Sequence, residues 1–172
     1  MPNIEHFFSK TPFLSQPKYP VQTFIWENIF SQDLVISIEA TAAKLTNTAA
    51  GETNPVRQLE MMKTTKDYLD KALTHLYLHS APDDVTPGKR DLRNRLHKSL
   101  GRACIILYML TSDETVKPGI EQCARYNLRT FVDHEGQVDP EKADFPYNQT
   151  EFIKVAKGWL GLEDFSTLKF VK

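Results

Sequence analysis

The stretch from Thr86 to Asp113 constrains the fold of this chain more than any other, because it predicts one long helix with two unlike halves. Thr86 is suited to cap that helix, and Pro87 to occupy its first position, where the missing N–H has no partner to lose. Apolar residues then recur at spacings of three and four, which is the period of one helix face. They are Leu92, Leu96, Leu100, Ala103, Leu107 and Leu110.

The two halves of this helix differ in charge. Between residues 89 and 102, six lysines and arginines stand against a single acid, in a chain whose net charge is −1. The helical period places Arg90, Arg93 and His97 on the side away from the apolar stripe. The residues after Arg102 are apolar on all sides. We therefore expect the first half of the helix at the surface and the second half in the core.

The basic half allows two interpretations. It is either a solvated surface, on which the lysine and arginine stems cover apolar neighbours, or a face that binds phosphate or an acidic partner. In the second case the cations would contact the backbone of RNA or DNA without reading its sequence. The residues concerned are Lys89, Arg90, Arg93, Arg95, Lys98 and Arg102.

The rest of the chain predicts four more helices and little or no β structure. They cover about residues 31–46, 54–80, 117–134 and 150–162. The second of them starts with Asn54 and Pro55, again a cap followed by a proline. We expect an all-α, up-and-down helical bundle of about five helices, forming one domain over residues 31–172.

The first 30 residues differ from this domain and predict an extended, aromatic and proline-rich N-terminal arm. They contain prolines at positions 2, 12, 17 and 20 and seven aromatic residues. An arm this aromatic needs cover, which either its own domain or a partner could provide. In the second case the partner is another protein or a second copy of the chain. The docking residues would be Phe7, Phe8, Phe13 and Trp26.

Cysteine and histidine usage indicates neither a disulfide framework nor a metal centre. Cys104 and Cys123 are typical of reduced core residues in a cytoplasmic protein, with a single bridge between them as the alternative. His75 and His79 share a helix face and could chelate a metal, but a third ligand is not evident. Without a metal, the two residues are expected to be surface histidines near the end of a helix. We expect no metal and no cofactor.

No segment predicts contact with a membrane. The N-terminus lacks the basic and apolar regions of a secretory signal, and no apolar run reaches the ~20 residues that span a bilayer. We therefore expect a cytoplasmic protein.

The run from Arg90 to His97 suggests a second function. Almost two helical turns separate these residues, so they share a face. A histidine can move a proton at a 2′-hydroxyl while an arginine holds the phosphate. The run resembles the Arg-x(4–6)-His motif of the HEPN family, small all-helical bundles that include many ribonucleases. Asp91 fits the polar residue that usually follows the arginine there, whereas Arg93 departs from the commonest form, because its histidine comes one residue too early.

Two functions follow from these patterns. The leading prediction is a non-enzymatic interaction module that binds a protein partner or itself through the arm, and nucleic-acid backbone through the basic face. The alternative, implied by the resemblance, is a metal-independent ribonuclease in which Arg90 and His97 are catalytic, in a site that such enzymes generally form across a dimer. The sequence leaves open whether the protein is an enzyme.

Overall fold

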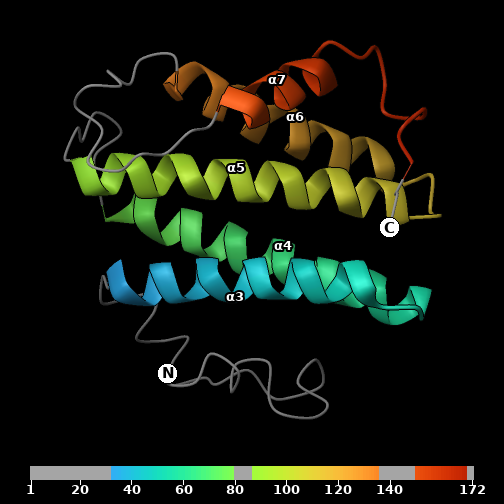
Figure 1. Ribbon diagram of the computed structural model, residues 1–172, viewed down its shortest axis with the longest axis horizontal. Helices are drawn as coiled ribbons and strands as arrows, with labels where there is room; N and C mark the ends of the chain where they lie inside the picture. Colours follow the sequence, from blue (N-terminus) through green and yellow to red (C-terminus); the bar gives the residue numbers. More distant parts are fainter. Residues whose placement is uncertain (1–31, 80–86, 136–149, 170–172) are drawn as a thin grey trace. The chain divides into compact units, whose positions relative to one another are not determined.

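A computed structural model of the chain describes residues 32–79, 87–135 and 150–169 (Figure 1). Within these ranges the ordered elements are five helices, without a strand. They are α3 (Gln32–Gly51), α4 (Pro55–Leu78), α5 (Pro87–Leu110), α6 (Lys117–Glu135) and α7 (Thr150–Leu160). The prediction of an all-α bundle of about five helices is confirmed. The N-terminal arm and the cap at Thr86 lie outside the described residues.

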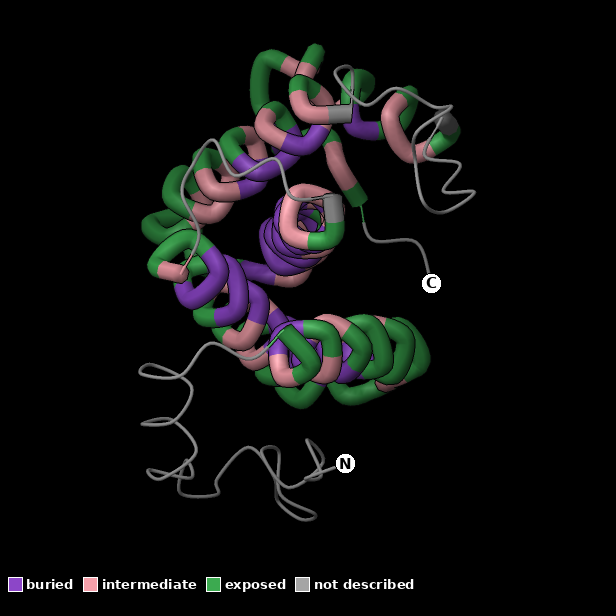
Figure 2. The backbone as a smooth tube through the Cα atoms, turned by 90° about the vertical axis from the view of Figure 1, so that its left-hand side faces the viewer, coloured by how far each residue is buried: buried purple, intermediate pink, exposed green. Residues whose placement is uncertain are grey.

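The helices fall into two compact units, which we describe separately. The first unit lies within residues 1–84 and contains α3 and α4. The second lies within residues 85–171 and contains α5, α6 and α7. In each unit the buried residues form stripes along the helices (Figure 2). The predicted boundary between an arm and a single bundle domain stays a prediction.

The first unit is a hairpin of α3 and α4. Its turn ends at Asn54, the residue predicted to cap the second helix. The side-chain oxygen of Asn54 accepts hydrogen bonds from the backbone N–H groups of Val56 and Arg57, at 3.0 and 3.3 Å, with Pro55 at the first helical position. The buried Gln58 donates from Nε2 to the carbonyl of Ala49 at 2.8 Å. This bond ties the first turn of α4 to the last turns of α3.

The prediction that the first helix ends near residue 46 is wrong, because α3 continues to Gly51. The hydroxyls of Thr46 and Thr48 each donate to a backbone carbonyl one turn earlier, at 2.9 Å. These threonines therefore satisfy their polar groups within the helix instead of opening a loop. Ala49 is also buried, so packing holds the extra turn in place.

In the second unit α5 and α6 form an antiparallel hairpin. His97 contacts Asn127, whereas Cys104, later in α5, contacts Cys123, which is earlier in α6, so the two helices run in opposite directions. The two helices pack closely at Gly101. A Cβ added there would lie 2.7 Å from side-chain atoms of Leu128, so a larger residue would push the helices apart.

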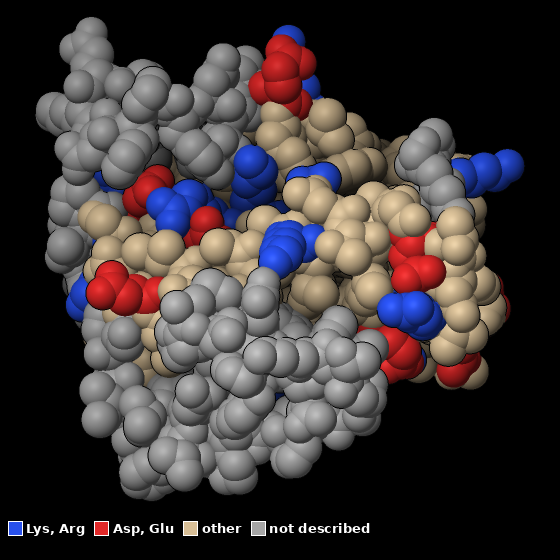
Figure 3. Space-filling model, turned by 60° about the horizontal axis from the view of Figure 1, so that its bottom comes forward, with Lys and Arg blue, Asp and Glu red and all other residues tan. Residues whose placement is uncertain are grey.

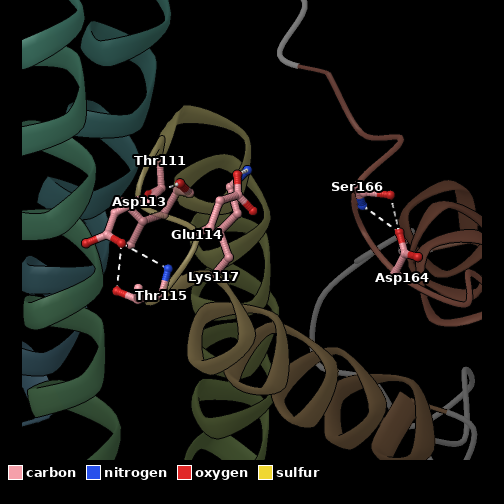
Figure 4. A network of polar contacts seen from close by, with 8 residues as sticks. Thr111, Asp113, Glu114, Thr115, Lys117, Asp164 and Ser166 are labelled. Atoms are coloured by element: carbon pink, nitrogen blue, oxygen red, sulfur yellow. Dashed lines mark hydrogen bonds and ion pairs between the residues drawn. The ribbon is translucent and has the colours of Figure 1, made fainter.

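Short-range polar contacts close the turn between α5 and α6 (Figure 4). The Asp113 carboxylate accepts hydrogen bonds from the backbone N–H and the hydroxyl of Thr115, at 2.9 and 2.7 Å. These bonds favour the ionised carboxylate and lower the pKa of Asp113. Lys117, at the start of α6, pairs with Glu114 at 2.8 Å. The chain therefore reverses within a few residues.

The segment after α7 packs onto α6 through Arg125. Its guanidinium donates to the carbonyls of Leu160, Leu162 and Glu163, at 3.2, 2.8 and 3.3 Å. It also lies 4.4 Å from the ring centre of the fully buried Phe165. A short turn follows in which Asp164 accepts hydrogen bonds from Ser166 (Figure 4).

Candidate anion-binding site

The basic half of α5 and the end of α6 bring four cationic or titratable side chains together. Arg90, Arg93 and His97 follow one another at spacings of three and four along α5, so they lie on one side of that helix. His97 faces α6, where its Nδ1 lies 2.8 Å from Oδ1 of Asn127. The ring centres of His97 and His134 are 6.3 Å apart. We call Arg90, Arg93, His97 and His134 the cationic cluster.

The expectation that this side of α5 faces solvent is wrong. His97 is fully buried and Arg93 is only 5% exposed. The apolar stripe, represented by Leu92 and Leu96, is buried too, so α5 is covered on both sides here. The physical reason on the histidine side is α6, which presents Asn127 as a polar partner to the imidazole. Arg90 remains half-buried.

Asn127 fixes the protonation pattern of the His97 ring. Its Nδ2 donates to the carbonyl of Cys123 at 2.8 Å, which assigns Oδ1 as the atom that faces His97. Because Oδ1 can only accept, the proton of the neutral imidazole sits on Nδ1. Nε2 of His97 is then the ring nitrogen that carries the lone pair.

His97 is neutral at physiological pH. Burial lowers its pKa from 6.5 to about 4, because the charged imidazolium loses its hydration. The hydrogen bond to Asn127 opposes this change, whereas the charges of His134 and Arg93 add to it. Proton uptake by His97 is therefore disfavoured by its surroundings.

The pKa of His134, in the same region, is also lowered. Burial is the main cause that lowers its pKa, and the guanidinium groups of Arg93 and Arg90 lower it further. The neighbouring Asp133 acts in the opposite direction. Both arginines of this side of α5 therefore act on the imidazole of His134.

The six residues of the predicted nucleic-acid face do not act alike. Arg90 and Arg93 belong to the cationic cluster. Arg95 instead pairs with Asp91 at 2.9 Å, and the Lys98 ammonium lies 4.8 Å from the ring centre of Phe152. The two others are Lys89, which is half-buried, and Arg102, which is exposed. On the surface drawn in Figure 3, lysines and arginines alternate with acids, so among the described residues no broad basic stripe is visible there.

The α6 residues of the site were missed by the sequence analysis. Asn127 and His134 are seven residues apart and therefore share a helix face, a signal that was available in the sequence. Tyr126, with its ring centre 6.2 Å from that of His97, is 63% exposed and lies at the edge of the site. What the sequence did not reveal is that this face of α6 packs on the histidine side of α5.

The other predicted sites have different outcomes. The proposed docking residues Phe7, Phe8, Phe13 and Trp26 lie outside the described part of the chain. In α4 the rings of His75 and His79 are 4.5 Å apart, and His75 is buried rather than at the surface. The described ranges contain no group of three or more potential metal ligands. Within them, none of the helices is long and apolar enough to cross a membrane.

Comparison with protein-family models, with curated proteins and with solved structures finds no match for this chain.

Proposed function

We propose that this chain is a helical module that binds the phosphate backbone of single-stranded RNA through the cationic cluster, without cutting it. The observation that carries the proposal is geometric: Arg90, Arg93 and His97 lie on one side of α5, and the ring centre of His97 is 6.3 Å from that of His134 in α6. Guanidinium groups form short, charge-assisted hydrogen bonds with phosphate oxygens, and two arginines one helical turn apart could contact the same phosphate backbone. Arginine is well suited to this role, because its planar fork can bind two phosphate oxygens at once.

The burial of His97 supports binding rather than cleavage. A general base must come within hydrogen-bond distance of the proton that it removes, and no part of the His97 side chain is exposed. Its pKa of about 4 also makes it a weak base at neutral pH. We assign His97 the task of holding α5 against α6, while the half-buried Arg90 meets the ligand.

Metal-independent RNA cleavage by Arg90 and His97 is the second candidate. Two features favour it: the tautomer of His97 that leaves Nε2 able to accept a proton, and the second imidazole 6.3 Å away. One imidazole could take the proton of the 2′-hydroxyl while the other protonates the leaving oxygen. This function requires an opening of the α5–α6 hairpin that exposes His97.

One experiment separates the two functions. Labelled single-stranded RNA is incubated with the protein at two salt concentrations, without added metal, and run on native and denaturing gels. The variants are Arg90→Ala and, as a matched control, Arg129→Ala. Arg129 is an exposed arginine of α6 about 200° around the helix from Asn127. Circular dichroism melts establish that both variants are folded.

The proposal expects a salt-sensitive complex with intact RNA, weakened by Arg90→Ala and unchanged by Arg129→Ala. The loss of one phosphate contact should also reduce the slope of log affinity against log salt by about 1. RNA fragments that disappear in a folded His97→Gln variant would establish cleavage instead. Absence of binding at low salt, or equal weakening by both arginine substitutions, would refute the assignment of the cluster. Docking of a protein partner or a second copy through the arm stays a prediction.

A further inference from the structure

The two cysteines of the chain meet between α5 and α6. The Sγ atoms of Cys104 and Cys123 are 3.1 Å apart, although 18 residues separate them in the sequence. This is closer than two sulfur atoms rest in ordinary van der Waals contact, and the pair is not joined as a disulfide. A disulfide bond of about 2.05 Å needs the sulfurs to approach by only about 1 Å more.

The surroundings of the pair distinguish its two members. Cys104 is fully buried, whereas Cys123 is half-buried and the one that a small reagent can reach. Nδ2 of Asn127 lies 3.5 Å from Sγ of Cys123, where an N–H donor stabilises a thiolate. One turn away from Cys104, Gly101 packs closely against Leu128, so the two helices are in close contact beside the cysteine pair.

We propose that Cys104 and Cys123 form a redox modification site, which a small hydroperoxide converts into an intrachain disulfide between α5 and α6. The inference rests on the geometry of the thiols and does not depend on the proposed RNA binding. A small oxidant reaches a half-buried thiol more readily than a bulky reagent does, so the chemistry favours hydrogen peroxide as the oxidant.

The reaction has two steps. In the first, the Cys123 thiol loses its proton and the thiolate attacks one oxygen of the peroxide. The O–O bond breaks, the sulfur becomes a sulfenic acid, and the second oxygen leaves as hydroxide, which takes up the proton lost by the thiol and becomes water. In the second, Sγ of Cys104 attacks Sγ of Cys123. The S–O bond breaks, the S–S bond forms, and the hydroxyl leaves with the Cys104 proton as water. Two thiols and one peroxide thus give one disulfide and two waters.

The experiment treats the full, reduced chain with a slight excess of hydrogen peroxide and follows its intact mass. We expect the loss of two hydrogen atoms, the disappearance of both thiols together, and a peptide that joins Cys104 to Cys123. Dithiothreitol should restore the mass. The same treatment in urea should form the bond more slowly, by roughly tenfold or more, because unfolding separates the sulfurs.

Two single variants test the assigned order. In Cys104→Ser, the sulfenic acid on Cys123 cannot be resolved and should react with dimedone. In Cys123→Ser, Cys104 should stay reduced. Three results would overturn the proposal: a wild-type protein that gains two oxygens on Cys123 while Cys104 stays a thiol, a disulfide-linked dimer, or equal rates of bond formation in the folded and unfolded chain. Because the wild-type reaction decides each of these, a variant that fails to fold does not affect the test.

Discussion

Nδ1 of His97 donates to Oδ1 of Asn127 at 2.8 Å, and this bond links two helices inside their hairpin. Asn127 is itself held by its bond to the carbonyl of Cys123. The neutral amide therefore supports the neutral imidazole, and both lie out of contact with water. The neutral state of His97 therefore fits its hydrogen bond to the uncharged amide of Asn127.

Replacement of Asn127 by Asp should raise the pKa of His97. A carboxylate at this position would stabilise the imidazolium and offset much of the burial that now lowers the pKa to about 4. The measurement is a titration of the imidazole signals by NMR. In the matched Asn127→Leu variant the carboxylate is absent and the His97 N–H loses its acceptor, so we expect a loss of about 1–3 kcal/mol in stability and no rise in pKa. An unchanged His97 pKa in Asn127→Asp would contradict the assignment.

Stability should fall as the pH drops from about 6.5 towards 4. The pKa of His97 is lower in the folded chain than its ordinary value of 6.5, so between these values the unfolded state binds more protons. This contribution is complete above pH 6.5 and is lost as the pH falls, by at most roughly 3 kcal/mol. The pKa values of His75 and His134 are also lowered, and they act in the same direction.

Urea unfolding of wild type and His97→Gln, followed from pH 7.5 to 4.5, isolates the His97 contribution. Glutamine can still donate to Asn127 but does not titrate. The stability of the variant should therefore depend less steeply on pH than that of wild type. Parallel curves for the two proteins would show that His97 is not the group responsible.

Gly101→Ala should destabilise the second unit, although alanine is the better helix former. The new Cβ would lie 2.7 Å from Cγ and Cδ2 of the buried Leu128 and 3.3 Å from its backbone nitrogen. We expect a loss of about 1–3 kcal/mol, measured by thermal melting. Gly158→Ala in α7 is the control, because, apart from its chain neighbours and the backbone of its own helix, its added Cβ meets nothing within 4 Å. The control should be neutral or stabilised by up to about 1 kcal/mol. A Gly101→Ala protein as stable as wild type would contradict the tight packing.

The helices could be predicted because their signals are local. A cap followed by a proline starts α4 at Asn54, and regular apolar spacing carries α5 through its whole length. The end of α3 was placed too early because residues 46–54 are small and polar, which is typical of a loop, whereas Thr46 and Thr48 bond back to their own helix. Local preference gives way there to the packing of Ala49.

The site could be predicted only in part. Helical spacing placed Arg90, Arg93 and His97 on one side of α5, where the ring of His97 lies near that of His134, and their role in binding stays a prediction. Spacing within one helix cannot say which neighbour covers a face, so the burial of His97 was not foreseen. The partner residue Asn127 is 30 positions away, and only the antiparallel register of α5 and α6 brings it to the imidazole.

Arg125→Lys should loosen the segment that follows α7. The arginine reaches three carbonyls of that segment, stacks on Phe165 and pairs with Glu121 at 2.7 Å. A lysine ammonium places its donors at a single point, so it cannot span these acceptors or stack in the same way. Hydrogen exchange is the appropriate measurement, because the N–H of Leu168 is bonded within this segment at 3.0 Å. Its protection should fall roughly tenfold, as expected for the loss of one to two hydrogen bonds. Arg129→Lys, at an exposed position of the same helix, is the control, and its exchange rates should match those of wild type. If Leu168 is as well protected in Arg125→Lys as in wild type, the segment is held by Phe165 alone.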